Sequence, residues 1–188
     1  MKKLVLVFIG IILCGFCYSQ TIFKGFEYGM TKSEAKKEFK TNKLEYTNID
    51  IGNGFIYRIY TQNFVYNNGK LAGILLTPKG SAFGQSYDLA ANYLTHTRGF
   101  FESLGYETFI DNEWWNAPVN YVASHSKWGL VLNKSDNSTI VQMYPISYIL
   151  SGRTVYLVKL MVWNYDWWMN SYNNENKKQT HIAKDSGF

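Results

Sequence analysis

Cysteine is almost absent from this sequence of 188 residues, in which Cys14 and Cys17 are the only two. If the segment that holds them is removed, the mature chain has no thiol. Disulfide bonds, Cys-ligated zinc, iron–sulfur clusters and thiol catalysis are then excluded together. A domain without such cross-links is held by its core, and a chain of this length with 46% hydrophobic residues can build one.

Histidine is nearly as scarce, since the chain carries only His96, His125 and His181. No two of them have the spacing of an HExxH zinc motif. The sequence also lacks a P-loop, a G-x-G-x-x-G fingerprint and a G-x-S-x-G nucleophile elbow. We therefore expect no metal, no cofactor and no catalytic residue, and we interpret the histidines as structural or solvated side chains.

Arginine is limited to Arg58, Arg98 and Arg153, although the formal net charge is +5. The lysines are scattered along the sequence apart from short pairs such as Lys36-Lys37. A nucleic-acid-binding surface usually needs a dense array of basic side chains that displaces counterions from phosphates. We therefore expect no nucleic-acid partner.

Proline is also rare, with three in the chain, and no Ser/Pro-rich or Gly/Ser-rich linker divides the sequence. The sequence predicts one domain over residues 20–170. Residues 171–188 are rich in Asn and Lys and are expected to form a polar C-terminal tail whose end frays.

Residues 1–19 have the pattern of a secretory signal peptide. Lys2 and Lys3 form a basic start, residues 4–13 form an apolar run, and Ser19 is a small residue before a cut ahead of Gln20. The apolar run is short for a bilayer span, so we expect no membrane span after cleavage. Bulky residues precede both cysteines, which does not fit a lipobox. The sequence predicts export to the periplasm or the extracellular space, with cleavage after Ser19.

The clearest structural pattern is a β-hairpin over residues 55–78. Apolar and polar side chains alternate with a period of two on both arms. Between the arms lies Asn67-Asn68-Gly69, and Asn and Gly tolerate the positive φ of a tight hairpin turn.

A first helix is predicted over SEAKKEFK. Thr31 and Glu34 fit a capping box at its start, and Ala35 and Phe39 form its buried side. Residues 44–51 are expected to be extended.

A second, longer helix is predicted from about Ser86 to Leu104, with Ser86 as its N-cap. Gly105 stands where a left-handed C-cap belongs, and a contact between Phe101 and Tyr106 is expected beside it.

The remainder of the chain is predicted to be mostly strands, at residues 119–125, 129–132, 139–144 and 154–163. The last of these has apolar residues on both faces, which indicates a central strand or a partly covered second face. Runs of strands separated by isolated helices indicate an α+β fold, with an antiparallel β-sheet and two helices packed on one face. The order of elements also fits a diverged duplication of a helix–β–β–β unit.

The segment from Phe26 to Ala35, FEYGMTKSEA, resembles the helix-start motif of many small exported bacterial proteins. In these an aromatic residue is followed by Gly, a bulky apolar residue, Ser or Thr, and Glu three residues on. Some are outer-membrane assembly lipoproteins of the BamE type, whose lipobox this chain lacks. The resemblance implies export and an α+β fold, and it transfers no site residue.

Tryptophan gives the most informative remaining pattern, because four of the six stand in two adjacent pairs. Core packing is the default interpretation of large aromatic side chains. Neighbours on a strand face opposite sides, however, and exposed Trp marks binding surfaces. Trp114, Trp115, Trp167 and Trp168 are therefore candidate ligand-binding residues.

The sequence thus predicts an exported, non-enzymatic domain that binds a protein or a glycan of the cell envelope. Two alternatives stay open. Asp111 and Glu113 are paired acids of the kind that a hydrolase of envelope polymers uses. Alternatively, the aromatic edge pairs with itself in a structural, self-associating envelope protein.

Overall fold

The computed structural model describes residues 20–80, 84–111 and 129–185, with side chains as far as Lys178. The elements of these residues, in chain order, are β1 (Thr21–Phe23), β2 (Phe26–Glu27), α2 (Lys32–Thr41), α3 (Lys43–Tyr46), β3 (Ile49–Asp50), β4 (Ile56–Asn67), β5 (Lys70–Pro78), α4 (Tyr87–Ser103), β6 (Tyr106–Ile110), β7 (Leu130–Lys134), β8 (Thr139–Leu150), β9 (Arg153–Asn164) and α6 (Tyr165–Asp185). Within these ranges, no helix has both the length and the apolar character needed to cross a membrane.

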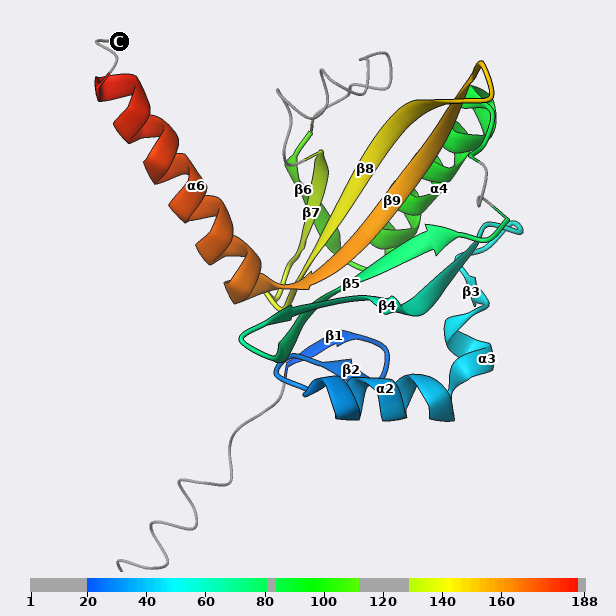
Figure 1. The fold of residues 1–188 in the computed structure, drawn as a ribbon, viewed down its shortest axis with the longest axis horizontal. Coiled ribbons are helices and arrows are strands. Elements are labelled where there is room, and N and C mark those ends of the chain that lie inside the picture. The colour runs from blue at the N-terminus through cyan, green and yellow to red at the C-terminus, as the bar shows by residue number, and fades with distance from the viewer. Residues whose placement is uncertain (1–19, 81–83, 112–128, 186–188) are drawn as a thin grey trace, which may run out of the picture.

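An antiparallel sheet forms the centre of the described chain (Figure 1), and its seven strands there have the order β3-β4-β5-β9-β8-β7-β6. β1 and β2 form a separate two-stranded sheet. The predicted class, α+β with an antiparallel sheet, is therefore confirmed. The duplicated helix–β–β–β unit stays a prediction.

Two long hairpins supply the four central strands. β4 and β5 form the hairpin predicted over residues 55–78, and Asn68 and Gly69 at its turn have φ of 48° and 75°. β8 and β9 are paired along their whole length, and Ser151 and Gly152 at their turn have nearly the same φ, 49° and 77°. Positive φ at both central residues gives a turn whose twist matches that of the flanking strands.

The larger hydrophobic core lies on one face of the sheet, called here the first face. α2, α3 and α4 all contribute buried residues to it. Every second residue of β9 faces it, as Val158, Leu160 and Val162 show. The predicted helix α2 supplies Ala35 and Phe39, both buried as expected.

The helix ends follow the predicted local chemistry. At α2 the capping box is present, because Thr31 N donates to the Glu34 carboxylate at 2.7 Å and Glu34 N donates to Thr31 Oγ1 at 3.3 Å. At α4, Ser86 Oγ accepts from Leu89 N at 3.3 Å. Gly105 follows α4 with φ of 82°, the left-handed conformation that favours glycine.

The extended segment expected at residues 44–51 is wrong in its first half, where α3 forms. Tyr46 in α3 is 2% exposed, and its ring lies 4.6 Å from that of Phe26. Thr47 Oγ1 then donates to Lys43 O at 2.9 Å and closes the turn. Burial of the Tyr46 ring against β2 therefore overrides the weak local preference of this short segment.

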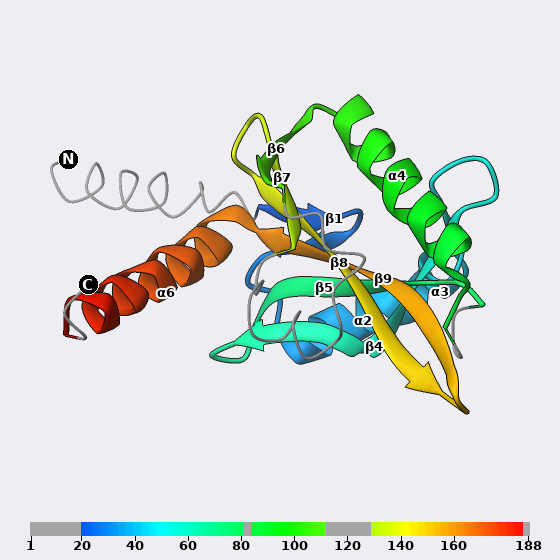
Figure 2. The same ribbon diagram turned by 90° about the horizontal axis from the view of Figure 1, so that it is seen from above.

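The opposite, second face of the sheet carries a smaller core. Met161 and Trp163 of β9 face it, and α6 covers part of it through Trp168. Helix α6 was not predicted from the sequence. Figures 1 and 2 show that α6 meets the sheet at its first turns and then projects away from the body. A helix that projects in this way can have a polar composition. Residues 171–185, expected as part of a polar tail, continue this helix.

Candidate functional site

The tryptophans proposed as ligand-binding residues are placed in different surroundings. Trp114 and Trp115 lie outside the described residues. Trp168 is 1% exposed and belongs to the second core, whereas Trp167 is half-buried. A fully buried Trp168 has no free face to offer a ligand, so within this pair a surface role is left to Trp167.

The pair at the start of α6 fastens this helix to the sheet. The ring of Trp167 stacks on that of Trp163, with centroids 4.8 Å apart. The indole N–H groups of Trp163 and Trp168 both donate to Oε1 of the buried Gln142, at 2.9 and 3.2 Å. One side-chain oxygen thus satisfies two buried donors and joins β8, β9 and α6.

The acidic pair considered for a hydrolase gives that function no support. Glu113 lies outside the described residues. Asp111 accepts a hydrogen bond from Arg98 Nη1 at 3.2 Å, and Arg98 Nε also donates to Glu102 at 2.9 Å. Asp111 is exposed and held in a surface ion-pair network that links α4 to the end of β6.

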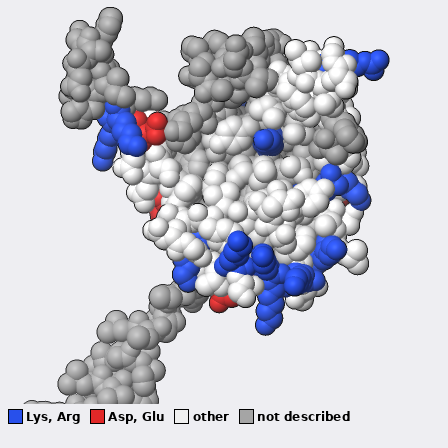
Figure 3. All heavy atoms as spheres, in the orientation of Figure 1, with Lys and Arg blue, Asp and Glu red and all other residues white. Residues whose placement is uncertain are grey.

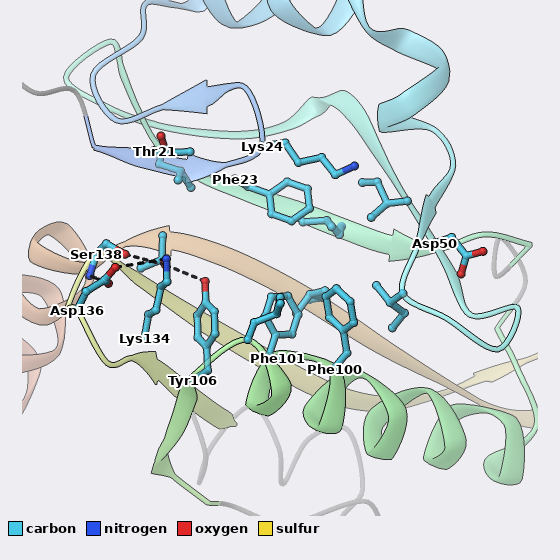
Figure 4. Close-up of a pocket in the computed structure, with 17 residues that line it drawn as sticks. Thr21, Phe23, Lys24, Asp50, Phe100, Phe101, Tyr106, Lys134, Asp136 and Ser138 are labelled. Carbon is cyan, nitrogen blue, oxygen red and sulfur yellow. Dashed lines mark hydrogen bonds and ion pairs between the residues drawn. The ribbon is translucent and has the colours of Figure 1, made fainter.

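A cavity of about 600 Å³ opens between β1 and α4, and we take it as the candidate site (Figure 4). Phe100 and Phe101 reach into it from α4, and Phe23, the last residue of β1, lies across from them. The floor is made by Leu76 of β5 and Leu160 of β9, which are 1% and 0% exposed. The walls and floor are therefore mainly aromatic and aliphatic.

Contacts between aromatic rings of α4 and β6 hold the phenyl rings of this wall in place. The rings of Phe100 and Phe101 meet edge to face with centroids 5.3 Å apart. Phe101 and Tyr106 meet in the same way at 5.2 Å, which confirms the contact expected around the helix end. Leu104, at the mouth of the cavity, is 52% exposed. These edge-to-face pairs fix the positions of the three rings relative to one another.

One end of the cavity is polar. Tyr106 Oη and Thr139 Oγ1 lie 2.8 Å apart, and Ser138 Oγ lies 3.4 Å from Thr139 Oγ1. Beside them Lys134 Nζ lies 3.3 Å from Asp136 Oδ2. Figure 4 shows these groups together at the end of the cavity next to β6 and the β7–β8 turn. A ligand that enters here meets hydroxyl groups and the Lys134–Asp136 ion pair in a mainly apolar wall.

The turn between β7 and β8 fixes this polar end. Asn137 takes a positive φ of 55°, and its N–H donates to Lys134 O at 2.8 Å. Ser135 N donates to Gly105 O at 3.2 Å, which ties the turn to the end of α4. Asn tolerates the left-handed conformation that this tight turn needs.

The protonation states at the polar end follow from its surroundings. Burial raises the pKa of the Tyr106 phenol, while its hydrogen bond with Thr139 acts in the opposite direction. Hydrogen bonds from Ser138 lower the pKa of the Asp136 carboxyl. At neutral pH, Tyr106 is therefore a neutral hydrogen-bonding group and Asp136 is an anion that balances Lys134.

The opposite end of the cavity is an open rim. Lys24 Nζ forms an ion pair with Glu45 Oε1 at 3.0 Å, and Asp50 Oδ1 accepts from Gly52 N at 2.7 Å. Lys24 and Asp50 are both exposed, so their charges are screened by solvent.

Among the described lining residues, the hydroxyl groups of Ser138 and Thr139 have no histidine beside them, and Asp136 already pairs with Lys134. A hydroxyl nucleophile needs a neighbouring base to accept its proton. Over the part of the chain that is described, no group of three or more His, Cys, Asp or Glu is placed to hold a metal ion.

The chain matches no family model, no curated protein and no solved structure, so the site is interpreted from its own geometry.

Sequence reasoning missed this cavity. Its walls come from the beginning and the middle of the chain, and its floor comes from two strands far apart in sequence. The only local signal was the aromatic cluster at the end of α4, where Phe100, Phe101 and Tyr106 lie close in sequence.

Proposed function

We propose that the protein is an exported, non-enzymatic binding protein whose ligand is a small amphipathic molecule held in the cavity between β1 and α4. The apolar body of the ligand lies against Phe100, Phe101 and Leu160. Its polar group, a carboxylate or a hydroxyl, lies at the Tyr106–Thr139 end beside Lys134. This refines the expected envelope ligand from a glycan or a protein to a lipid-like molecule.

The single observation that carries the proposal is the composition of the cavity. Its volume of about 600 Å³ falls in the range of sites for small ligands, roughly 300–1,000 Å³. Its floor and walls are mainly apolar, and the hydroxyl groups of Tyr106, Ser138 and Thr139 lie together at one end, whereas the charged Lys24 and Asp50 lie at the exposed rim. Such a site favours a molecule with one apolar and one polar part, because each part then meets a matching surface.

A glycan fits this cavity less well than a lipid-like ligand. A sugar carries hydroxyl groups on all sides, and each one buried without a partner would cost free energy. The floor residues Leu76 and Leu160 offer no hydrogen-bonding group. Export is part of the proposal through the signal-peptide pattern of residues 1–19. The periplasm or the extracellular space is then where the ligand is met.

The test is a titration of the chain from Gln20 with a fluorophore-labelled dodecanoic acid, followed by fluorescence anisotropy. Unlabelled dodecanoic acid, dodecanol and a soluble cell-wall glycan serve as competitors. We expect saturable binding with a Kd on the order of 1–10 μM, displaced by the two apolar competitors and not by the glycan.

Two variants with the same change localise the binding. Leu104→Asp places a charge at the mouth of the cavity and should weaken binding by about tenfold, since it removes apolar contact and adds a desolvation cost. Leu44→Asp changes a residue that is 82% exposed and does not line the cavity. Equal binding by both variants, or displacement by the glycan alone, would contradict the proposal.

A further inference from the structure

The tip of the β8–β9 hairpin forms an exposed apolar surface separate from the cavity. β5 pairs with β9 between Leu160 and Trp163, and β7 pairs with β8 as far as Met143. β8 and β9 pair with each other well beyond these limits, to Leu150 and Arg153. The hairpin thus continues as a ribbon past its neighbours, and Figure 1 shows its tip at the end of the body away from α2.

Two large aliphatic side chains stand at the end of this ribbon. Ile149 is 76% exposed and Leu150 is 37% exposed, directly before the Ser151-Gly152 turn. Successive residues of a strand face opposite sides, so each face of the tip carries one of them. Adjacent exposed aliphatic residues at a protruding turn have no role in the core of this fold.

Tyrosine rings lie behind the aliphatic residues on both faces. Tyr148 shares a face with Leu150, and Tyr156 shares the other face with Ile149. The ring of Tyr87, at the start of α4, meets the ring of Tyr156 edge to face, with the centroids 5.3 Å apart. At about 3.3 Å per residue, Tyr148 stands roughly 10 Å and Tyr156 roughly 13 Å behind the turn.

The charges of the ribbon all have one sign. Residues 144–159 contain two charged side chains, Arg153 and Lys159, and both are exposed cations. Arg153 pairs across the turn with Leu150, so it stands at the level of the aliphatic residues. Its long apolar stem allows the guanidinium to reach an anionic layer while its neighbours go deeper.

From this arrangement of aliphatic, basic and tyrosine side chains along the ribbon, we infer that the tip of the β8–β9 hairpin inserts into the interface of an anionic lipid bilayer. Ile149 and Leu150 enter the acyl boundary, Arg153 reaches the phosphate groups, and the tyrosines lie in the headgroup layer behind them. Tyr is favoured at this depth because its ring is apolar and its hydroxyl is polar. The distance from the turn to Tyr148 is at the upper end of the roughly 5–10 Å to which interfacial segments enter a bilayer, and Tyr156 lies slightly farther out. This inference stands independently of the cavity.

A different basic surface competes with the tip for anionic lipid. The exposed side of α2 carries four lysines, at positions 32, 36, 37 and 40, and Figure 3 shows Lys and Arg gathered along that edge of the molecule. Lysines alone attract an anionic surface without insertion. The experiment therefore has to separate insertion of the tip from attraction by α2.

The test uses the chain from Gln20, which keeps every residue that the structure describes and has no cysteine. Ser151→Cys, labelled with an environment-sensitive fluorophore, reports on the tip. Asn68→Cys reports on the β4–β5 turn, whose φ angles are nearly the same. Each labelled protein is mixed with vesicles of equal parts phosphatidylglycerol and phosphatidylcholine, and with vesicles of phosphatidylcholine alone.

We expect a blue shift of the label at position 151 on the anionic vesicles and none at position 68. The Ile149→Ser variant should weaken vesicle binding by about tenfold, and Arg153→Gln by roughly fivefold. Leu44→Ser, at an exposed residue away from the tip, should leave binding unchanged. The inference is overturned if neither label shifts, if both shift alike, or if Lys36→Glu with Lys37→Glu abolishes binding while Ile149→Ser leaves it intact.

Discussion

The two faces of the central sheet are closed by different means. On the first face, α2, α3 and α4 cover a broad core of aliphatic and aromatic residues. On the second face, one helix at the end of the chain docks through a few large aromatic residues around Gln142. The first face leaves the cavity between β1 and α4, whereas contacts at the start of α6 are stacked and hydrogen-bonded. Within the described residues, the face covered by several separate elements holds the cavity, and the face that α6 meets holds a small cluster of stacked aromatic residues.

The largest effect should come from removing one large aromatic from each face. Trp168→Ala on the second face and Phe26→Ala on the first face each remove a side chain that is at most 1% exposed. Each should lower the free energy of unfolding by about 3–5 kcal/mol, through lost burial and the cavity left behind. Urea unfolding followed by both circular dichroism and tryptophan fluorescence measures it.

This pair of variants also tests whether the two faces unfold together. We expect one cooperative transition for both variants, with coincident signals from the two probes. If Trp168→Ala lost helical signal and kept the wild-type midpoint, α6 would be an independent appendage.

The next effect concerns the buried polar bonds of the two faces. Gln142→Leu leaves the indole N–H groups of Trp163 and Trp168 without their shared acceptor. Unfolding free energy should fall by about 2–3 kcal/mol, because each unsatisfied buried group costs roughly 1–3 kcal/mol. On the first face, Thr97→Val removes a single partner of Tyr57 Oη, 2.8 Å away, and should cost about 1 kcal/mol. Equal losses of unfolding free energy for the two variants, measured by urea unfolding, would show that an acceptor shared by two donors contributes no more than one with a single partner.

A smaller effect should appear at alkaline pH. Burial raises the pKa of Tyr57 on the first face and of Tyr144 on the second, while hydrogen bonds with Thr97 and Gln142 act in the opposite direction. The unfolded chain releases these protons near pH 10 and the folded chain keeps them, so stability falls as pH rises above that value. From about pH 9 to about pH 11 each tyrosine should remove about 1 kcal/mol.

Phenylalanine variants isolate this alkaline effect. Tyr57→Phe and Tyr144→Phe should each flatten the fall of unfolding free energy with pH, measured by urea unfolding at a series of pH values. Tyr46, whose pKa is raised to about 12 by burial and by its bond to Glu38, should lose its contribution between about pH 10 and pH 12. A slope that neither Tyr57→Phe nor Tyr144→Phe alters would rule out these two buried phenols as its source.

The smallest effect is expected at Trp167. Its ring is half-buried and stacks on Trp163 without a deep position in the core. Trp167→Ala should therefore cost about 1 kcal/mol of unfolding free energy, the size of one aromatic stacking contact. A loss as large as that of Trp168→Ala would show that the outer ring, and not the buried one, holds α6.

The features predicted correctly from the sequence depend on neighbouring residues. The capping box of Thr31 and Glu34, the Asn-Gly turn at Gly69 and the glycine end of α4 at Gly105 all act within a few residues. The interactions that form these features lie within a short segment, so the local sequence pattern is sufficient to predict them.

The features missed depend on partners far away in the chain. α3 forms because Tyr46 finds a place against Phe26, and α6 forms where Trp168 meets Gln142. Neither partner can be identified from the local pattern. The cavity depends on β1 lying opposite α4, which no single segment encodes. The same limit explains why Trp168, taken as a surface candidate, is buried: adjacent tryptophans predict opposite faces in a strand, but here they lie on a helix.

A nuclear magnetic resonance titration can locate the proposed ligand site on the first face. Dodecanoic acid is added to the isotope-labelled chain from Gln20, and methyl and aromatic signals are followed. We expect saturable shifts at Leu76, Leu160, Phe101 and Tyr106, with the signals of Trp163 unchanged. Shifts confined to the tryptophans of the second face, or no saturable shift at all, would contradict the proposed site.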